Sequence, residues 1–260
     1  MHTLIIGKRV ITQLKGDKRF LAMSIIAPLI IIYFLKLLFS AIAPVAPPPM
    51  PGFFPMPVMP TISSPKFIMP AIALIVHFLS FVLCAILLVQ ERTRGTLERM
   101  LISGFKKTSI IAGYTIGYFG LATVQAIVVL AEAIWLFELH LDTKTILLLF
   151  SVIWMLAIVS VMLGIFISTF ARHEGHVFPF IPLIILPSVF LTGVIVSPDK
   201  LPRWAEYVGC LLPLRYANNI IETISNGLYK ITDVALDFSI LAGYAVALLV
   251  IASKTLRETE

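Results

Sequence analysis

The chain has 260 residues, of which 59% are hydrophobic and only 13% are charged, and its mean hydropathy is +0.99. This composition excludes an ordinary soluble domain, in which about 25% of residues are charged. The net charge of +6 does not indicate nucleic-acid binding, because the basic residues lie in short segments between long apolar runs and form no single patch.

The first predicted element is residues 1–19, in which Ile6, Val10 and Leu14 recur every four positions among polar and basic residues. This period predicts an amphipathic helix lying in the membrane interface, and a frayed polar tail is the alternative. The first transmembrane helix is expected over Phe20–Ile42. Small residues at 41–43 resemble a signal cleavage site, but the apolar run exceeds the about 7–15 residues of a signal peptide, so an uncleaved helix is favoured.

Residues 44–60 contain eight prolines in seventeen positions. Proline at this density excludes regular helix and strand and predicts an extended segment. We favour a stiff outer spacer. The alternative is that its Met and Phe side chains touch the outer leaflet or guide an apolar substrate.

Five further transmembrane helices are expected from the apolar runs Phe67–Val89, Ser109–Phe137, Thr145–Phe170, Val177–Val196 and Val234–Ala252. Small residues recur every four positions at Gly113 and Gly117, and again at Ser160, Gly164 and Ser168. Such stripes let helices approach closely within lipid, so they predict packing and specify no substrate. The fold class is therefore an all-α membrane protein with six transmembrane helices.

Residues 90–108, between the second and third spans, carry the most informative pattern in the chain. Gly95 and Gly104 bracket a short helix that begins at Thr96. In this helix Leu97, Met100 and Leu101 share one face, and the rim is charged. Docking to a soluble partner is the favoured interpretation, and a charged loop that only sets topology is the alternative.

Residues 197–233 separate the fifth and sixth spans and are not simply hydrophilic. The segments Leu201–Leu212 and Tyr216–Leu228 predict two short helices, and prolines interrupt the fifth span before them. We expect a re-entrant helical hairpin in the outer leaflet, which is allowed where protein satisfies its backbone.

Thirteen basic residues fall in the segments on one side of the predicted spans and six on the other. By the positive-inside rule, both termini and residues 90–108 are expected to be cytoplasmic, in a plasma or bacterial inner membrane. Two charges remain inside spans, Lys36 in the first and Glu132 in the third. Because charges in lipid are costly, an ion pair between them is one hypothesis, and separate snorkelling or protonation is the other.

The histidines give little evidence of chemistry. His77 in the second span is expected to be a hydrogen-bonded packing residue. His173 and His176 lie in a short turn with too few neighbouring ligands for a stable metal site, so no metal is predicted. The sequence has no G-x-x-x-x-G-K-[ST] phosphate loop. The chain is therefore not expected to be an enzyme, and energy coupling is expected from a partner.

Several segments resemble one family of membrane proteins. Glu91-Arg92, followed by Gly95-Thr96-Leu97-Glu98, is similar to the inner-loop motif of ABC-2 type transporter permeases. The resemblance continues in order along the chain, at Lys8-Arg9, Gly16-Asp17-Lys18-Arg19, Ala27-Pro28, Leu186-Pro187-Ser188-x-Phe190-Leu191-x-Gly193, Leu201-Pro202-x-Trp204 and Leu212-Pro213-Leu214-x-Tyr216. It implies that residues 1–260 form a single ABC-2 type transmembrane domain.

The resemblance implies an exporter subunit that dimerises, with itself or a paralogue, and docks cytoplasmic ATPase subunits that carry ATP and magnesium. Residues 1–19 would be the elbow helix and residues 90–108 the coupling loop. The predicted docking residues are Glu91, Arg92, Gly95, Thr96, Leu97, Glu98, Met100 and Leu101. Candidates for the translocation path are Lys36, Glu132, Pro187, Thr192, Gly193 and Tyr216. A drug, antibiotic or lipid is the expected cargo, with sodium or glycan export, a non-transporting scaffold or sensor, and a passive channel as alternatives.

Overall fold

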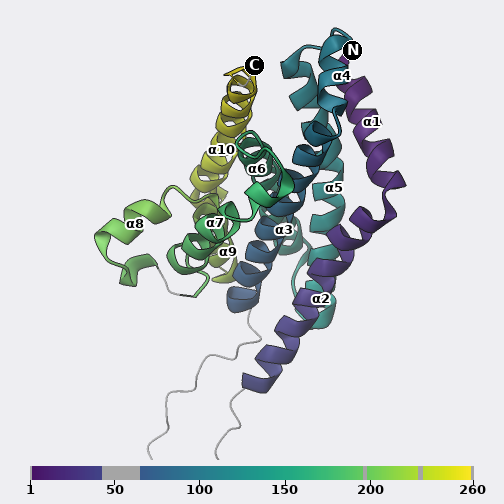
Figure 1. Cartoon of the computed structure of the whole chain (residues 1–260). Helices are drawn as coiled ribbons and strands as arrows, with labels where there is room; N and C mark the ends of the chain where they lie inside the picture. The colour runs from purple at the N-terminus through teal and green to yellow at the C-terminus, as the bar shows by residue number, and fades with distance from the viewer. Residues whose placement is uncertain (1, 43–64, 196–197, 228–230, 259–260) are drawn as a thin grey trace, which may run out of the picture.

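The computed structural model describes residues 2–42, 65–195, 198–227 and 231–258, and within these ranges all regular secondary structure is helical. The predicted proline-rich segment 44–60 lies outside the described residues. Six apolar helical stretches of the described chain are long enough to cross a membrane. Both ends of the chain and a short helix, α4, lie at one end of the bundle (Figure 1).

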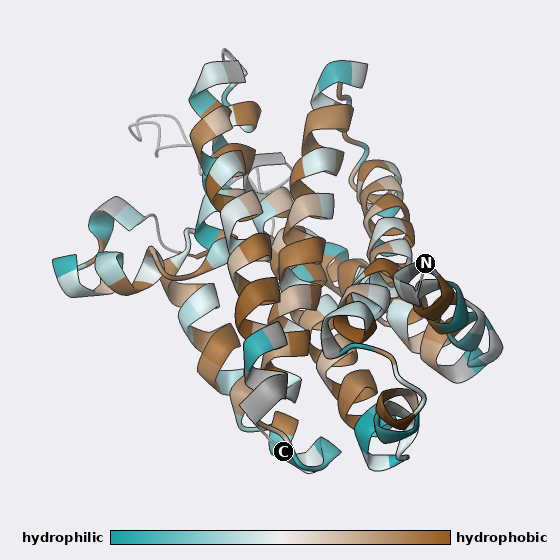
Figure 2. Ribbon diagram, turned by 90° about the horizontal axis from the view of Figure 1, so that it is seen from above, coloured by the Kyte–Doolittle hydropathy of each residue, from teal (hydrophilic) through white to brown (hydrophobic). Residues whose placement is uncertain are grey.

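The helices, in chain order, are α1 (His2–Gly16), α2 (Lys18–Ile42), α3 (Pro65–Thr93), α4 (Thr96–Ile102), α5 (Lys107–Leu136), α6 (Thr143–Ser168), α7 (Phe180–Leu191), α8 (Arg203–Gly209), α9 (Pro213–Ser225) and α10 (Ile231–Glu258), with 3-10 turns at Glu174–Val177 and Pro198–Lys200. Apolar residues predominate along the long helices when the bundle is viewed from above (Figure 2). The predicted transmembrane segments therefore correspond to helices, and five of the six match closely.

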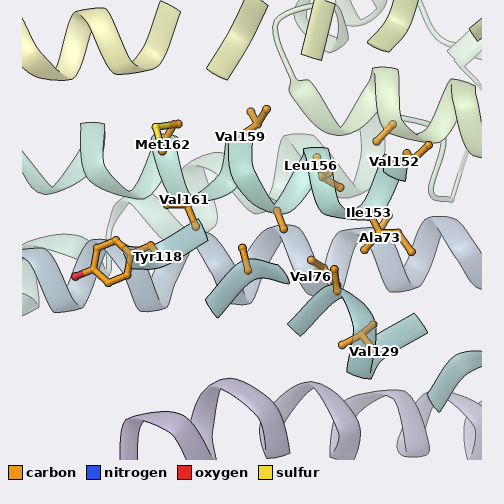
Figure 3. Close-up of a cluster of buried hydrophobic side chains, with 14 of the residues drawn as sticks. Ala73, Val76, Tyr118, Val129, Val152, Ile153, Leu156, Val159, Val161 and Met162 are labelled. Atoms are coloured by element: carbon orange, nitrogen blue, oxygen red, sulfur yellow. The ribbon is translucent and has the colours of Figure 1, made fainter. Parts of the chain in front are cut away.

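The centre of the bundle is the contact between α3 and α6, with α5, α9 and α10 packed around it. Figure 3 shows part of this core, in which side chains of α3, α5 and α6 interdigitate, among them Ala73, Val76, Val129, Ile153 and Leu156. In the most apolar stretch of α3, 61% of residues are buried, against 17% for α2 and 11% for α10. Helices α2 and α10 thus present most of their apolar side chains outward, as lipid-facing helices do.

The stripe of Ser160, Gly164 and Ser168 predicted a close helix contact, and the structure shows that its partner is α3. A Cβ at Gly164 would lie 2.6 Å from the Phe81 carbonyl oxygen and 3.0 Å from the Ala85 nitrogen. His77 Nδ1 lies 2.7 Å from Ser160 Oγ across the same contact. The prediction that His77 is a hydrogen-bonded packing residue is confirmed.

The predicted fifth span, Val177–Val196, is wrong in its extent. The structure has a 3-10 turn at Glu174–Val177 and then α7, which has only 12 residues and ends at Leu191. Together the turn and α7 form the apolar stretch Glu174–Leu191, 18 residues long, which is one of the six candidate membrane spans although its helix is interrupted. The helix stops where Gly193 adopts φ of +90°, a left-handed conformation that L side chains avoid.

The two helices predicted between the fifth and sixth spans are present as α8 and α9, with α9 starting at Pro213 as expected of an N-terminal proline. Helix α9 packs against α3, α6 and α10. Its fully covered side chains include Leu214, Ala217, Ile220 and Ile221. The second half of the predicted hairpin is therefore an integral part of the protein core.

Candidate functional site

The connection between α3 and α5 is built by two glycines in left-handed conformations. Gly95 has φ of +67° and precedes α4, and Gly104 has φ of +82° and follows it. The Arg99 guanidinium donates to the carbonyl oxygens of Gly95 and Arg94, at 3.3 and 2.9 Å, and so holds the first turn. The predicted helix within residues 90–108 is confirmed, with Gly95 as its N-cap and Thr96 as its first residue.

Glu91, at the end of α3, is buried rather than presented to a partner. Gln13 Nε2 donates to one carboxylate oxygen, and the Tyr114 hydroxyl donates to the other at 2.9 Å. Arg9 Nη2 lies 3.8 Å from this second oxygen. With only 4% of Glu91 exposed, this arrangement, which we call the Glu91 cluster, joins α3 to both α1 and α5.

The Glu91 cluster extends to α4. Arg9 Nη1 also lies 3.1 Å from Met100 Sδ, and Met100 itself is buried. Leu101 is partly buried and packs against the main core. The face predicted to dock a partner is therefore turned inward at these two positions, toward α1 and the bundle. The side chain of Leu97 lies outside what the structure describes.

The outward side of α4 carries a different set of residues. Glu98 and Arg99 are exposed, and 86% of the Ile102 side chain is accessible. Ile102 was not among the predicted docking residues, because in the sequence it simply follows Met100 and Leu101 in an apolar run. Arg92 does not reach this surface: it is half-buried, and its guanidinium lies 3.4 Å from the Ala171 carbonyl oxygen after α6.

The glycine stripe of α5 holds α1. A Cβ at Gly113 would lie 2.5 Å from Ile6 Cβ, and one at Gly117 would collide with Val10. The stripe of Ile6, Val10 and Leu14 is almost fully buried. Close packing at these glycines was predicted, but its partner is α1, whose apolar stripe faces protein instead of lipid.

Of the two hypotheses for Lys36 and Glu132, the ion pair does not form; both residues are described, and neither makes a salt bridge in the structure. One Glu132 carboxylate oxygen is buried without a hydrogen-bond partner. The positions of Lys36 and Glu132 along their spans predicted similar depths in the membrane, but they could not predict the direction in which each side chain faces.

The remaining candidates for the translocation path gather around the end of α7. Pro187 lies inside α7. Thr192 is fully buried, and Asn218 Nδ2 donates to its carbonyl oxygen at 2.9 Å. The Tyr216 hydroxyl donates to the Cys210 carbonyl oxygen at 2.8 Å. The first bond joins the end of α7 to α9, and the second joins α9 to the residue that follows α8.

Asn218→Ala is expected to lower the free energy of unfolding by about 1–3 kcal/mol, because it leaves the buried Thr192 carbonyl without its donor. Thermal unfolding in detergent measures the change. Ser225→Ala on the same helix is the matched control: Ser225 Oγ is buried with no partner among the described residues, so its loss should change stability by less than about 0.5 kcal/mol. Equal effects of the two substitutions would contradict a role for the Asn218 bond.

Six apolar helical stretches are long enough to span a bilayer, and a short charged helix that contacts α1 joins two of them at one end of the bundle. These features define a multi-pass helical membrane protein. The profile of the family described as "ABC-2 type transporter" matches residues 1–224. The chain belongs to the ABC-2 type transporter family.

Three curated relatives illustrate the similarity. The chain is 27% identical over 199 residues to ABC transporter G family member 20 of Dictyostelium discoideum, covering 75% of this chain and 27% of that protein. It is 26% identical over 160 residues to the probable multidrug ABC transporter permease YbhR of Escherichia coli, covering 61% and 43%. It is 23% identical over 171 residues to the linearmycin resistance permease protein LnrN of Bacillus subtilis, covering 65% and 44%. The chain thus spans less than half the length of these relatives.

Proposed function

We propose that this chain is the transmembrane permease subunit of an ATP-binding-cassette exporter. A separate cytoplasmic ATPase subunit binds ATP and magnesium, and a second permease copy, identical or paralogous, completes the pathway. The observation that carries the proposal is α4, which exposes Glu98, Arg99 and Ile102 while Met100 fixes its other side to α1. A short rigid helix with one free face suits docking to a soluble protein.

The proposed orientation places α4 and both termini in the cytoplasm, with the protein in the cell membrane. It rests on the thirteen basic residues against six in the sequence, and it agrees with the common position of α4 and the two chain ends (Figure 1). In this orientation α1 acts as the elbow helix at the cytoplasmic interface, and α8 and α9 form the re-entrant hairpin on the outer side.

The Glu91 cluster supplies a route by which an ATPase acts on the membrane helices. A partner that displaces α4 also displaces Met100, which touches Arg9 of α1. Gln13 on α1 and Tyr114 on α5 both bind Glu91 of α3. We propose that α1, α3, α4 and α5 respond to the ATPase as one unit for this reason.

We propose a hydrophobic or amphipathic cargo, such as a drug, antibiotic or lipid. The apolar spans with few charges support this class, as do the words "multidrug" and "linearmycin resistance" in the names of the relatives. Sodium and glycan export are the alternatives within transport. ATP-dependent flux in vesicles holding the chain and its ATPase tests the proposal. Partner binding without any flux would favour a scaffold or sensor instead.

The double substitution of Glu98→Lys with Ile102→Asp is expected to weaken binding of the ATPase subunit at least about tenfold, a cost of about 1.4 kcal/mol. Both side chains are exposed on α4, so the change reverses the charge and removes the apolar contact without disturbing the core. Co-purification with an ATPase encoded beside this chain, followed by ATPase stimulation, measures the loss.

Lys200→Glu is the control for this pair, because Lys200 is an exposed residue in the connection between α7 and α8, remote in the fold from α4. The control should bind the ATPase as the unchanged chain does. Full ATPase binding by the α4 double variant would contradict the docking proposal, whereas loss in both variants would indicate a general effect of surface charge.

A further inference from the structure

A cavity of about 240 Å³ opens between α1, α2 and α5. Its walls are almost entirely apolar, with Ile11 and Leu14 from α1, Leu21 from α2, and Leu121 and Val124 from α5. Lys15 is the one charged residue among those that line it. None of the docking or translocation candidates contributes to this cavity.

The cavity exists because α1 covers only part of the glycine face of α5. Gly113, Gly117 and Gly120 are spaced by four and three positions and so lie along one side of the helix. Ile6 and Val10 fill the space over the first two, but a Cβ at Gly120 would have nothing within 4 Å. Helix α1 ends at Gly16, before it reaches Gly120, and the chain turns into α2.

The cavity lies where the apolar part of the protein begins. The membrane-spanning stretch of α2 starts at Phe20, whereas Lys15 and Lys18 stand just before it and are exposed. Asp17 lies between them, but its carboxylate accepts the Phe20 backbone N–H at 3.0 Å and caps α2. Lys15 therefore lines the apolar recess, and Lys18 lies about one helical turn before the lining residue Leu21, where the apolar span begins.

We propose that this cavity binds a phospholipid, with one acyl chain over Gly120 and its phosphate at Lys15 and Lys18. The volume of about 240 Å³ lies below the about 300–1,000 Å³ of pockets for drug-sized ligands, so it suits a slender occupant such as part of one acyl chain. The two lysines select an anionic headgroup. The inference goes beyond the proposed export activity and does not rest on it, since binding requires neither an ATPase nor transport.

The test is native mass spectrometry of the whole chain in detergent, titrated with phosphatidylglycerol and, separately, with phosphatidylcholine. The unchanged chain should bind a first phosphatidylglycerol more tightly than phosphatidylcholine. Gly120→Leu fills the cavity and should weaken binding of both lipids at least about tenfold. Lys15→Gln should weaken phosphatidylglycerol about fivefold and leave phosphatidylcholine nearly unchanged.

Gly243→Leu and Lys254→Gln are matched controls on α10. A Cβ at Gly243, as at Gly120, has nothing within 4 Å, and Lys254, like Lys15, is exposed. Both controls should bind lipid as the unchanged chain does. Thermal unfolding of Gly120→Leu should show no loss of stability, because its side chain enters open space and leucine favours helix more than glycine does.

Three results would overturn the proposal. The first is unchanged lipid affinity in folded Gly120→Leu. The second is an equal loss in Gly243→Leu, which would indicate general detergent or lipid effects. The third is a change of Gly120→Leu from dimer to monomer with lipid binding intact, which would make the cavity a contact between two copies of the chain. Loss of ATP-dependent flux with lipid binding retained would bear on the export proposal alone.

Discussion

Glu91→Lys is expected to lower the free energy of unfolding by about 3–5 kcal/mol, the range for leaving an uncompensated charge at a buried position. The substitution removes the carboxylate that Gln13 and Tyr114 bind, and it sets a second positive charge beside Arg9. Its position is 4% exposed, so water cannot replace the lost partners. Thermal unfolding in detergent should show a large decrease in Tm.

The same substitution should also loosen α1 from α5, and a disulfide can report this directly. A Cβ at Gly7 would lie 3.4 Å from Ile116 Cβ, close to the about 3.5–4.5 Å that disulfides require. Gly7→Cys with Ile116→Cys, in a background with Cys84 and Cys210 replaced by alanine, should therefore cross-link readily. Adding Glu91→Lys should reduce the cross-linked fraction severalfold.

Glu98→Lys is the matched control, since it reverses the same charge seven residues further along. Glu98 is exposed on α4, so its reversal should change stability by less than about 0.5 kcal/mol and leave the cross-link intact. Equal stability of the two variants, together with equal cross-linking, would show that the Glu91 cluster does not hold α1. If Glu98→Lys alone lost ATPase binding, docking would depend on Glu98 and not on the contacts of the Glu91 cluster.

The contrast between Glu91 and Glu98 also shows where sequence analysis stops. Both carboxylates lie in one polar segment, and local pattern predicts that both are exposed. Glu91 is buried only because Gln13, 78 positions earlier, and Tyr114, 23 positions later, converge on it. Such contacts depend on how α1 and α5 pack and leave no periodic signal in the segment itself.

The long helices were predictable for a physical reason that acts locally. A bilayer core requires about 20 consecutive apolar residues. Each span can therefore be recognised from the composition of its own segment. The short helix α4 was predictable in the same way, because left-handed glycines at Gly95 and Gly104 mark its ends. The end of α7 was not, because apolar residues continue to Val196 after the helix has stopped at Leu191.

The stripes of small residues correctly predicted close helix packing, but they did not identify the partner helix. Gly113 and Gly117 predicted a close contact, yet the sequence could not say that α1 makes it. In the structure, the side chains of Ile6 and Val10 pack directly on these two glycines. A period-four apolar stripe and a period-four glycine stripe fit together, because both follow the same helical repeat.

The stripe on α6 leads to the second large expected effect. Gly164→Leu should destabilise the protein by at least about 3 kcal/mol, at or beyond the upper end of ordinary overpacking. A Cβ there would lie 2.6 Å from the Phe81 carbonyl oxygen and 3.0 Å from the Ala85 nitrogen. Both atoms belong to the backbone of α3, so no rotamer change relieves the collision, and α3 and α6 must separate.

Separating these helices affects the whole bundle, because their contact forms its centre. It also breaks the hydrogen bond between His77 and Ser160, which lies one turn away along α6. Unfolding by sodium dodecyl sulfate in mixed micelles measures the loss, with Gly243→Leu as the control at a helical glycine where a Cβ meets nothing within 4 Å. A stable Gly164→Leu protein would mean that α3 and α6 pack differently from the structure described, and the placement of Glu91 at the end of α3 would have to be revised with it.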